Sequence, residues 1–368
     1  MKIPLTKATI ENDDLKCMSS ALYKRAISQN DLTEVFERNY SKFIGTAGSV
    51  ATNSCTSAII LALATLNIKK EQEVILPSYT CLAVLNAVIQ YGVRPILADN
   101  SYDTDNMDFN IKPDSVKNLI TNKTGAIIVP HMFGVPADID DIIKMNIPVV
   151  EDITLSLGTF YKDRPVGSWG DISVCSFYNS KMISCGEGGM LSSKRSDLYE
   201  RAFYLNGWEK EQASMRLKKK NEFNYELRYN FRMSGIAASL GISQLEKLPI
   251  FIKKRCSIAK KFTSVLSNIR RLKLPKKTNK QNAFFRYLIA LENRNISSII
   301  QKFANHGIEV GRGVYPPLHW FFKLDKTKFS GAEKAVDTLL SIPIYPNLNN
   351  EQINYILEYT KNILTEKI

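Results

Sequence analysis

Three short segments of this chain carry side chains that could act together in chemistry. Ser54, Cys55 and Thr56 stand directly before an apolar stretch with helical spacing, and small hydroxylic residues there leave the first N–H groups of a helix free to bind an anion. Asp152 follows the apolar run 147–150, where a buried carboxylate needs a positive partner. Lys181 lies between another apolar run and a glycine-rich turn, which holds a nucleophilic amine in place.

Together these groups are the parts that a pyridoxal phosphate site needs. The lysine would form a Schiff base with the cofactor, the carboxylate would keep the pyridine nitrogen protonated, and the helix start would hold the phosphate. Taken singly, they favour plainer interpretations, which are an N-cap, a structural salt bridge and a solvated lysine. Asp152 could also bind a metal, but no second ligand stands nearby and the three histidines lie far apart in the sequence. We therefore predict no metal site.

Strand and helix patterns must position these groups. From about residue 45 to residue 195, short runs rich in Val and Ile alternate with amphipathic segments, which is typical of a mainly parallel sheet with helices on both faces. The predicted strands are 73–76, 95–98, 126–129, 148–150, 172–175 and 189–191, and the predicted helices are 56–66, 81–90, 113–120 and 137–145. Because ligands bind beyond the carboxyl ends of such strands, we expect the reactive residues on one rim.

The pattern changes in the C-terminal part of the chain. A long helical stretch begins near Ser239, a basic mixed region follows, and a closing helix is predicted around 351–364. The segment 275–281 opens with proline and is otherwise polar, so we predict a surface loop there. These features predict a large domain over 1–250, with an N-terminal arm over 1–20, and a smaller α+β domain over 251–368.

Charge is distributed unevenly along the 368 residues. The chain carries 49 Lys and Arg against 36 Asp and Glu, a net charge of +13, but residues 1–200 have a charge of −4 and residues 201–368 have +17. Such asymmetry could indicate a nucleic-acid or membrane-surface partner. However, the basic runs 218–220 and 253–255 lack an aromatic platform or a helix-turn-helix pattern. We interpret the charge first as a solvated surface and second as a field that attracts a diphosphate-bearing substrate, and predict no nucleic-acid partner.

Composition also limits the cellular setting. No apolar run approaches the length that spans a bilayer, and the first residues lack the apolar core of a signal peptide. The six cysteines form no CxxC pair, and a chain of this size needs no disulfide framework. The sequence therefore predicts a cytoplasmic protein without a membrane span.

An ordered set of motifs gives the chain a family resemblance. It resembles the DegT/DnrJ/StrS-type PLP-dependent sugar aminotransferases, which have the fold type I architecture of aspartate aminotransferase. The motifs are NSCTSA at 53–58, LPSYTC at 76–81, GVPADIDD at 134–141, VED at 150–152, VGSWGDISVCSF at 166–177, GEGGM at 186–190, YNFRMS at 229–234, QLEKL at 244–248, YPPLH at 315–319 and PIY at 343–345. The resemblance implies an α/β fold with a PLP-binding large domain and a smaller C-terminal domain.

The resemblance also implies roles for individual residues. Lys181 would hold the cofactor and then move the proton during transfer, and Asp152 would pair with the pyridinium nitrogen. The phosphate would be held by a group of small residues, namely Ser54, Cys55, Thr56 and Ser176. Cys81 stands where many members stack an aromatic ring on the cofactor, and Leu155 stands where most carry a glutamine that anchors it.

Further positions point to the substrates and to a partner subunit. Asn230 resembles the residue that reaches a neighbouring subunit's phosphate, which implies a homodimer with shared sites, and Tyr315 and His319 resemble a segment that borders the sugar pocket. The implied reaction moves an amino group from glutamate to the keto sugar of a nucleoside-diphosphate sugar, for surface glycan or related biosynthesis. Two alternatives stay open: a transaminase for a cyclitol or another small ketone, and a non-catalytic PLP-fold binding protein, which Cys81 and Leu155 would favour.

Overall fold

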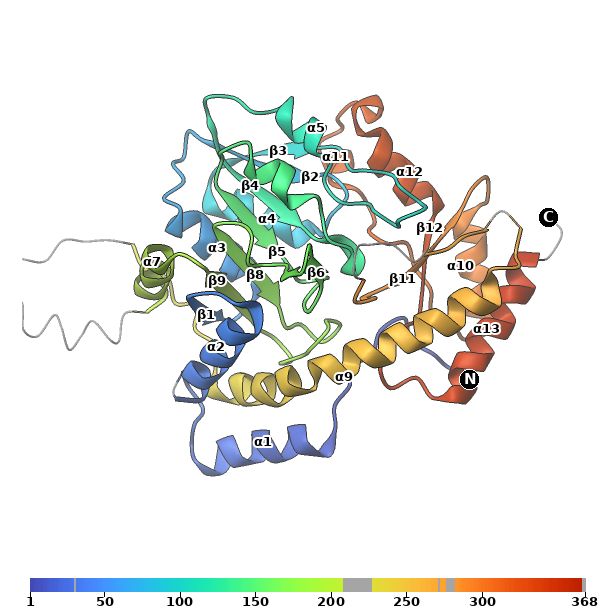
Figure 1. Ribbon diagram of the computed structural model, residues 1–368, viewed down its shortest axis with the longest axis horizontal. Helices are drawn as coiled ribbons and strands as arrows, with labels where there is room; N and C mark the ends of the chain where they lie inside the picture. The colour runs from blue at the N-terminus through green and yellow to red at the C-terminus, as the bar shows by residue number, and fades with distance from the viewer. Residues whose placement is uncertain (30, 208–226, 271, 276–281, 366–368) are drawn as a thin grey trace, which may run out of the picture.

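A seven-stranded sheet lies at the centre of the computed structural model, which describes residues 1–29, 31–207, 227–270, 272–275 and 282–365 (Figure 1). Its strands, in spatial order, are β1 (Gly48–Thr52), β9 (Gly189–Ser193), β8 (Ile172–Ser176), β5 (Val149–Asp152), β4 (Thr124–Pro130), β2 (Glu73–Pro77) and β3 (Arg94–Ala98). Within this sheet β9 runs antiparallel to both of its neighbours, and the pairs from β8 to β3 are parallel. The predicted mainly parallel α/β sheet is thus confirmed.

Helices cover both faces of this sheet and bury two apolar cores. One core packs α3 (Cys55–Thr65), α4 (Leu82–Tyr91) and α7 (Ser196–Asn206) against the sheet. The other takes residues from α2 (Asp31–Ile44), α5 (Pro113–Lys117), α6 (Ile139–Ile143) and the first half of α9 (Gly235–Leu266). The central strands β2, β4, β5 and β8 are buried along their whole length, which explains their continuous runs of Val and Ile.

The 32-residue helix α9 connects the two parts of the chain. The side chain of Ser234 caps it by accepting a hydrogen bond from the Ala237 N–H, and α1 (Asn12–Tyr23) packs along it. Leu245 and Leu248 lie in the second core, whereas Ile258 and Phe262 lie in a third core at the other end of the helix. In Figure 1 the helix runs along the lower side of the molecule from one part to the other.

The third core belongs to a small antiparallel sheet in the C-terminal part. Its strands are β10 (Leu272–Lys273), β11 (Tyr287–Leu291) and β12 (Leu339–Ile342), and its helices are α10 (Ile296–Asn305) and α13 (Asn350–Thr365). Two further helices, α11 (Leu318–Phe321) and α12 (Ser330–Thr338), contribute residues to the first core. The hairpin of β6 (Phe160–Tyr161) and β7 (Arg164–Pro165) stands apart from both sheets.

Most predicted elements are present within a few residues of the expected bounds. Strand β1 is not among the predicted strands. The predicted domain boundary at residue 250 falls inside α9, and the division into 1–250 and 251–368 stays a prediction. Nearly all of the predicted loop over 275–281 and the basic run 218–220 lie outside the described residues. In the part of the chain that the structure describes, no helix combines the length and apolar character needed to cross a membrane.

Candidate active site

A cavity of about 230 Å³ opens beyond the carboxyl ends of the central strands. Seven residues predicted for the site lie together on its wall: Ser54, Cys55, Thr56, Cys81, Asp152, Ser176 and Lys181. Its other lining residues include Ile59, Thr80, Ala83, Val84, Pro130, Thr154, Leu155, Tyr178, Glu187 and Gly188. The reactive side chains predicted from separate motifs therefore share one space.

The N-terminus of α3 forms one end of the cavity. Ser54 lies in extended backbone and its Oγ accepts a hydrogen bond from the Ser57 N–H at 3.1 Å, so the helix begins at Cys55. The N–H groups of Cys55 and Thr56 have no carbonyl to bond within the helix. Strand β9 can approach this turn because Gly189 lacks a side chain: a Cβ there would collide with the backbone of Ser54 and Cys55. The result is a helix start with free donors that suits a phosphate.

Asp152 ends β5 with its carboxylate buried in the cavity wall. Its Oδ1 accepts a hydrogen bond from the Thr154 N–H at 2.9 Å. Burial raises the pKa of this carboxyl above its ordinary value, although the Thr154 hydrogen bonds and the positive charge of Lys181 act in the opposite direction. A buried carboxylate of this kind is stabilised by a protonated ring nitrogen placed against it.

Lys181 follows β8 on a tight turn. Its backbone N–H donates to the Tyr178 carbonyl at 2.9 Å, and Gly186 holds a left-handed conformation with φ 79° that glycine adopts without strain. The Nζ atom lies 5.6 Å from the ring centroid of Phe285. The turn thus presents one fixed amine to the cavity that also contains the Asp152 carboxylate.

Thr154 belongs to this site but is not among the residues predicted from the sequence. Its Oγ1 accepts a hydrogen bond from the Ser176 N–H at 3.1 Å and lies 3.5 Å from the Cys55 Sγ, while its own N–H bonds Asp152. It therefore ties the helix start, the strand end and the β8 end together. A threonine in an apolar run carries no signal of this role, because the three partners meet only after the sheet has formed.

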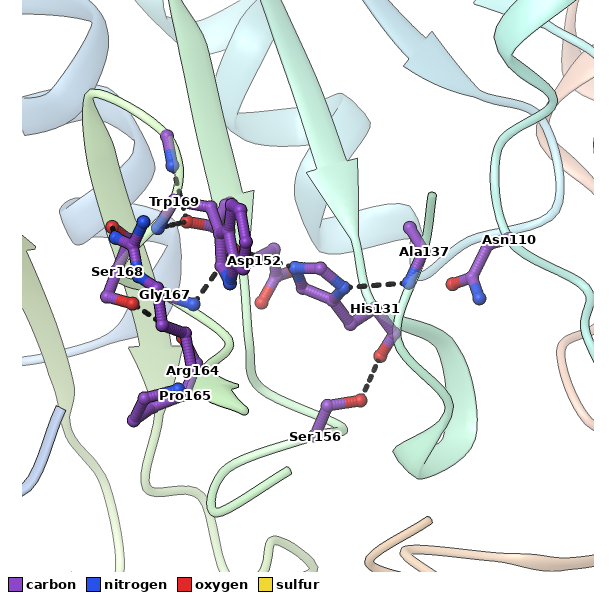
Figure 2. Close-up of polar contacts among 12 residues, drawn as sticks. Asn110, His131, Ala137, Asp152, Ser156, Arg164, Pro165, Gly167, Ser168 and Trp169 are labelled. Carbon is purple, nitrogen blue, oxygen red and sulfur yellow. Dashed lines mark hydrogen bonds and ion pairs between the residues drawn. The ribbon is translucent and has the colours of Figure 1, made fainter. Parts of the chain in front are cut away.

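Behind the cavity, a buried histidine holds the neighbouring carboxylate Glu151. The Ala137 N–H donates to His131 Nδ1 at 2.9 Å, so the ring proton is on Nε2 and donates to Glu151 Oε2 at 2.9 Å. Figure 2 shows His131 bonded to Ala137 and to Ser156, whose hydroxyl donates to the His131 carbonyl. Three backbone N–H groups also donate to Glu151, from Gly167, Trp169 and Gly170. The histidine, like Glu151, is a structural residue that fixes the end of β5.

We expect Glu151→Gln to lower the free energy of unfolding by about 3 kcal/mol, because an amide NH₂ would face N–H donors in a buried site. Burial raises the pKa of Glu151, but the bonds from His131, Gly170 and Gly167 outweigh it, and the pKa is lowered. The carboxylate's stabilisation is therefore complete above its ordinary pKa and is lost as pH falls through the lowered value. Urea denaturation at neutral and acidic pH measures this free energy of unfolding. Equal midpoints for Glu151→Gln and the exposed control Glu71→Gln would contradict the expectation.

Three predicted residues lie outside the cavity lining. Asn230 is exposed, Tyr315 is 62% exposed and lines a separate hollow with Arg312, and His319 is fully buried. The His319 ring bonds the Ser78 hydroxyl at 2.7 Å and the Glu333 carboxylate at 2.9 Å. The roles of these three residues toward the sugar and a partner subunit stay predictions.

The residues around the cavity fit pyridoxal phosphate. The free N–H groups of α3 suit a phosphate, the buried Asp152 carboxylate suits a protonated pyridine nitrogen, and Lys181 supplies the amine. Ala83, Val84 and Leu155 give the space between them an apolar wall for a ring.

Comparison with known proteins decides the family. The model of the DegT/DnrJ/EryC1/StrS aminotransferase family matches residues 8–361. The chain belongs to this family. The aminotransferase is 28% identical to the GDP-perosamine synthase of Escherichia coli O157:H7, over 99% of each chain, and 27% identical to the spore coat polysaccharide biosynthesis protein SpsC of Bacillus subtilis, over 98% of this chain and 97% of that one.

Solved structures agree on the fold of the aminotransferase. The PLP form of the putative sugar aminotransferase Spr1654 from Streptococcus pneumoniae superposes with a TM-score of 0.87, at 24% identity and over 99% of each chain. The predicted family, the fold type I architecture, the aminotransferase class and the cofactor pyridoxal phosphate are therefore confirmed.

Proposed function

We propose that this aminotransferase moves an amino group from glutamate to a keto sugar carried by a nucleoside diphosphate, in surface-glycan or related biosynthesis. The observation that carries the proposal is the joint placement of Lys181, Asp152 and the α3 start around one cavity. The names of the two curated relatives support it, since one is a GDP-perosamine synthase and the other a spore coat polysaccharide biosynthesis protein.

The residues of the cavity divide the work of amino transfer. Bound pyridoxal phosphate supplies an electron sink that acidifies the C–H bond next to the transferred nitrogen. The Lys181 Nζ would hold the cofactor and, once released, carry the proton from one carbon to the other. Asp152 would keep a proton on the ring nitrogen, and the α3 N–H groups with Ser176 would hold the phosphate. Ile59, Val84 and Leu155 give one wall of the cavity an apolar surface, which would keep water from that side of the cofactor.

An acceptor screen tests the proposed substrate class. The purified enzyme with pyridoxal phosphate and glutamate is offered keto-sugar nucleotides and, in parallel, cyclitol ketones, and products are identified by mass spectrometry. We expect an aminated nucleotide sugar. Product from cyclitol ketones alone would contradict the nucleotide-sugar proposal, and protein that fails to bind pyridoxal phosphate would contradict a catalytic role.

We propose further that the enzyme is a homodimer in which Asn230 of one subunit contacts the cofactor phosphate of the other. Asn230 is exposed in the single chain and lies outside the lining of that chain's own cavity, which suits a contact with a second copy. Mixed dimers of Asn230→Asp and Lys181→Ala subunits should regain activity, because one of the two sites in each mixed dimer is intact. Activity no higher than the sum of the two single variants would contradict shared sites.

A further inference from the structure

Arg286 stands in the bend just before β11, next to Phe285. Tyr287 packs its ring edge-on against Phe262 in the third core, at a centroid distance of 5.1 Å. Leu288, inside the strand, points to the opposite face from Tyr287 and belongs to the first core. Phe285, directly before Arg286, belongs to the second core. The guanidinium is thus placed between the small sheet and the part of the chain that carries the active site.

The Arg286 guanidinium is close to Lys181 and incompletely paired. Its Cζ lies 5.0 Å from the Phe285 ring centroid, and Lys181 Nζ lies 5.6 Å from the same centroid, so the two cations are at most 10.6 Å apart. The Nη1 atom is buried and has no hydrogen-bond partner among the described residues. Burial lowers the pKa of this group to about 10, against the raising effect of Glu309. A buried N–H without an acceptor destabilises the protein, and a ligand oxygen bonded to it removes that cost.

Arg255, a second buried arginine, contacts the same segment but has a structural role. The Nη1 of Arg255 donates to three backbone carbonyls, those of Phe284, Phe285 and Ile344, at 2.7 to 3.3 Å. It thereby fixes the chain that carries Phe285 and Arg286. Arg286 has no comparable set of carbonyls for its Nη1, and its side chain as a whole is only partly buried.

We propose that Arg286 binds a carboxylate of the amino donor, an inference that rests on the proposed function. A guanidinium accepts a carboxylate as a two-pronged pair, with about 4 Å between the two central carbons. The donor nitrogen must come to the position of Lys181 Nζ, and the carboxylate carbons of glutamate lie about 2.5 to 5 Å from that nitrogen. The sum is about 6.5 to 9 Å, a separation that the upper limit of 10.6 Å between Arg286 Cζ and Lys181 Nζ allows. A phosphate of the acceptor is separated from the reacting carbon by a whole sugar ring, so the donor carboxylate fits this position better.

The test compares Arg286→Met and Arg286→Lys with the exposed charge control Arg270→Gln, all as full-length protein loaded with pyridoxal phosphate. Glutarate, a dicarboxylate without an amino group, probes binding by calorimetry, and single-turnover spectra with glutamate and with alanine probe the donor step. For Arg286→Met we expect the Kd for glutarate to rise at least about tenfold, with unchanged or higher Tm because an unpaired buried group is removed. Arg286→Lys should be intermediate, and Arg270→Gln should match the wild type.

The possible results distinguish the proposed role of Arg286 from the proposed identity of the donor. Slower donor steps with both amino acids place the α-carboxylate on Arg286, and a loss with glutamate alone places the side-chain carboxylate there; both support the proposal. Unchanged glutarate binding and donor steps overturn it, as does an effect confined to the KM of the acceptor. If the wild type gives no donor step with glutamate, the proposed donor fails, while glutarate binding still decides the role of Arg286.

Discussion

Replacing Lys181 by alanine should lower kcat for amino transfer at least about a thousandfold, because the same amine serves as the covalent anchor and as the proton carrier. The turn that follows β8 fixes this amine in the cavity, and among the residues that line it Lys181 is the one with an amine. The exposed lysine variant Lys117→Ala should retain wild-type activity. Single-turnover mixing with glutamate, followed by cofactor absorbance, measures the loss.

A second variant separates the anchor from the charge. Lys181→Arg keeps a positive charge in the cavity but provides no amine to join the cofactor, so its kcat should fall as far as that of Lys181→Ala. Both variants should also lack the visible absorbance of lysine-bound cofactor while still binding it non-covalently. Activity of Lys181→Arg near the wild-type level would show that only the charge matters and would overturn the proposed role.

Replacing Asp152 by asparagine should lower kcat by at least about a hundredfold and weaken cofactor binding, since an amide cannot hold the ring nitrogen in its protonated form. The effect should appear in the donor step as well as in full turnover. The exposed variant Asp197→Asn, at the start of α7, provides the charge-matched control. Equal kcat and equal cofactor affinity for Asp152→Asn and wild type would contradict the pairing.

The same substitution has the opposite effect on the cofactor-free protein. Burial raises the folded-state pKa of Asp152, so the group favours folding while it is protonated, below its ordinary pKa, and this contribution is lost as pH rises through the raised value. Wherever the group is ionised, its buried charge opposes folding, so Asp152→Asn should leave the free energy of unfolding at neutral pH unchanged or higher. Urea denaturation of cofactor-free protein measures it, and a marked loss of stability would show that Asp152 is a structural carboxylate like Glu151.

The sequence was most informative where the chain is locally regular. The predicted strand 126–129 lies inside β4 and the predicted helix 56–66 differs from α3 by one residue at each end, because a buried Val and Ile run and a serine cap are local signals. Strand β1, with the sequence GSVAT, gives no such signal. Its existence depends on pairing with β9, a strand about 140 residues later in the chain.

The residues of the site divide in the same way, into those with a local sequence signal and those that depend on distant partners. Residues with distinctive chemistry after the strands, such as Asp152 and Lys181, could be found from the sequence, whereas Thr154 and the role proposed for Arg286 could not. Thr154 acts through three partners from three segments, and Arg286 was one charge among many in a basic stretch. His319 is expected at the sugar pocket from its motif, and that role stays a prediction. The motif does not predict that the residue is completely buried, with its ring bonded to Ser78, 241 residues earlier, and to Glu333, 14 residues later.

Helix α9 has a consequence for how the molecule loses its structure. The helix supplies Leu248 and Phe251 to a core of the central sheet and Phe262 and Leu266 to the core of the small sheet. Unfolding of either core therefore removes packing from a helix that the other core needs, so the two parts should unfold together. Denaturation should be a single cooperative transition, and cleavage within α9 should release two fragments of which neither keeps a native fold.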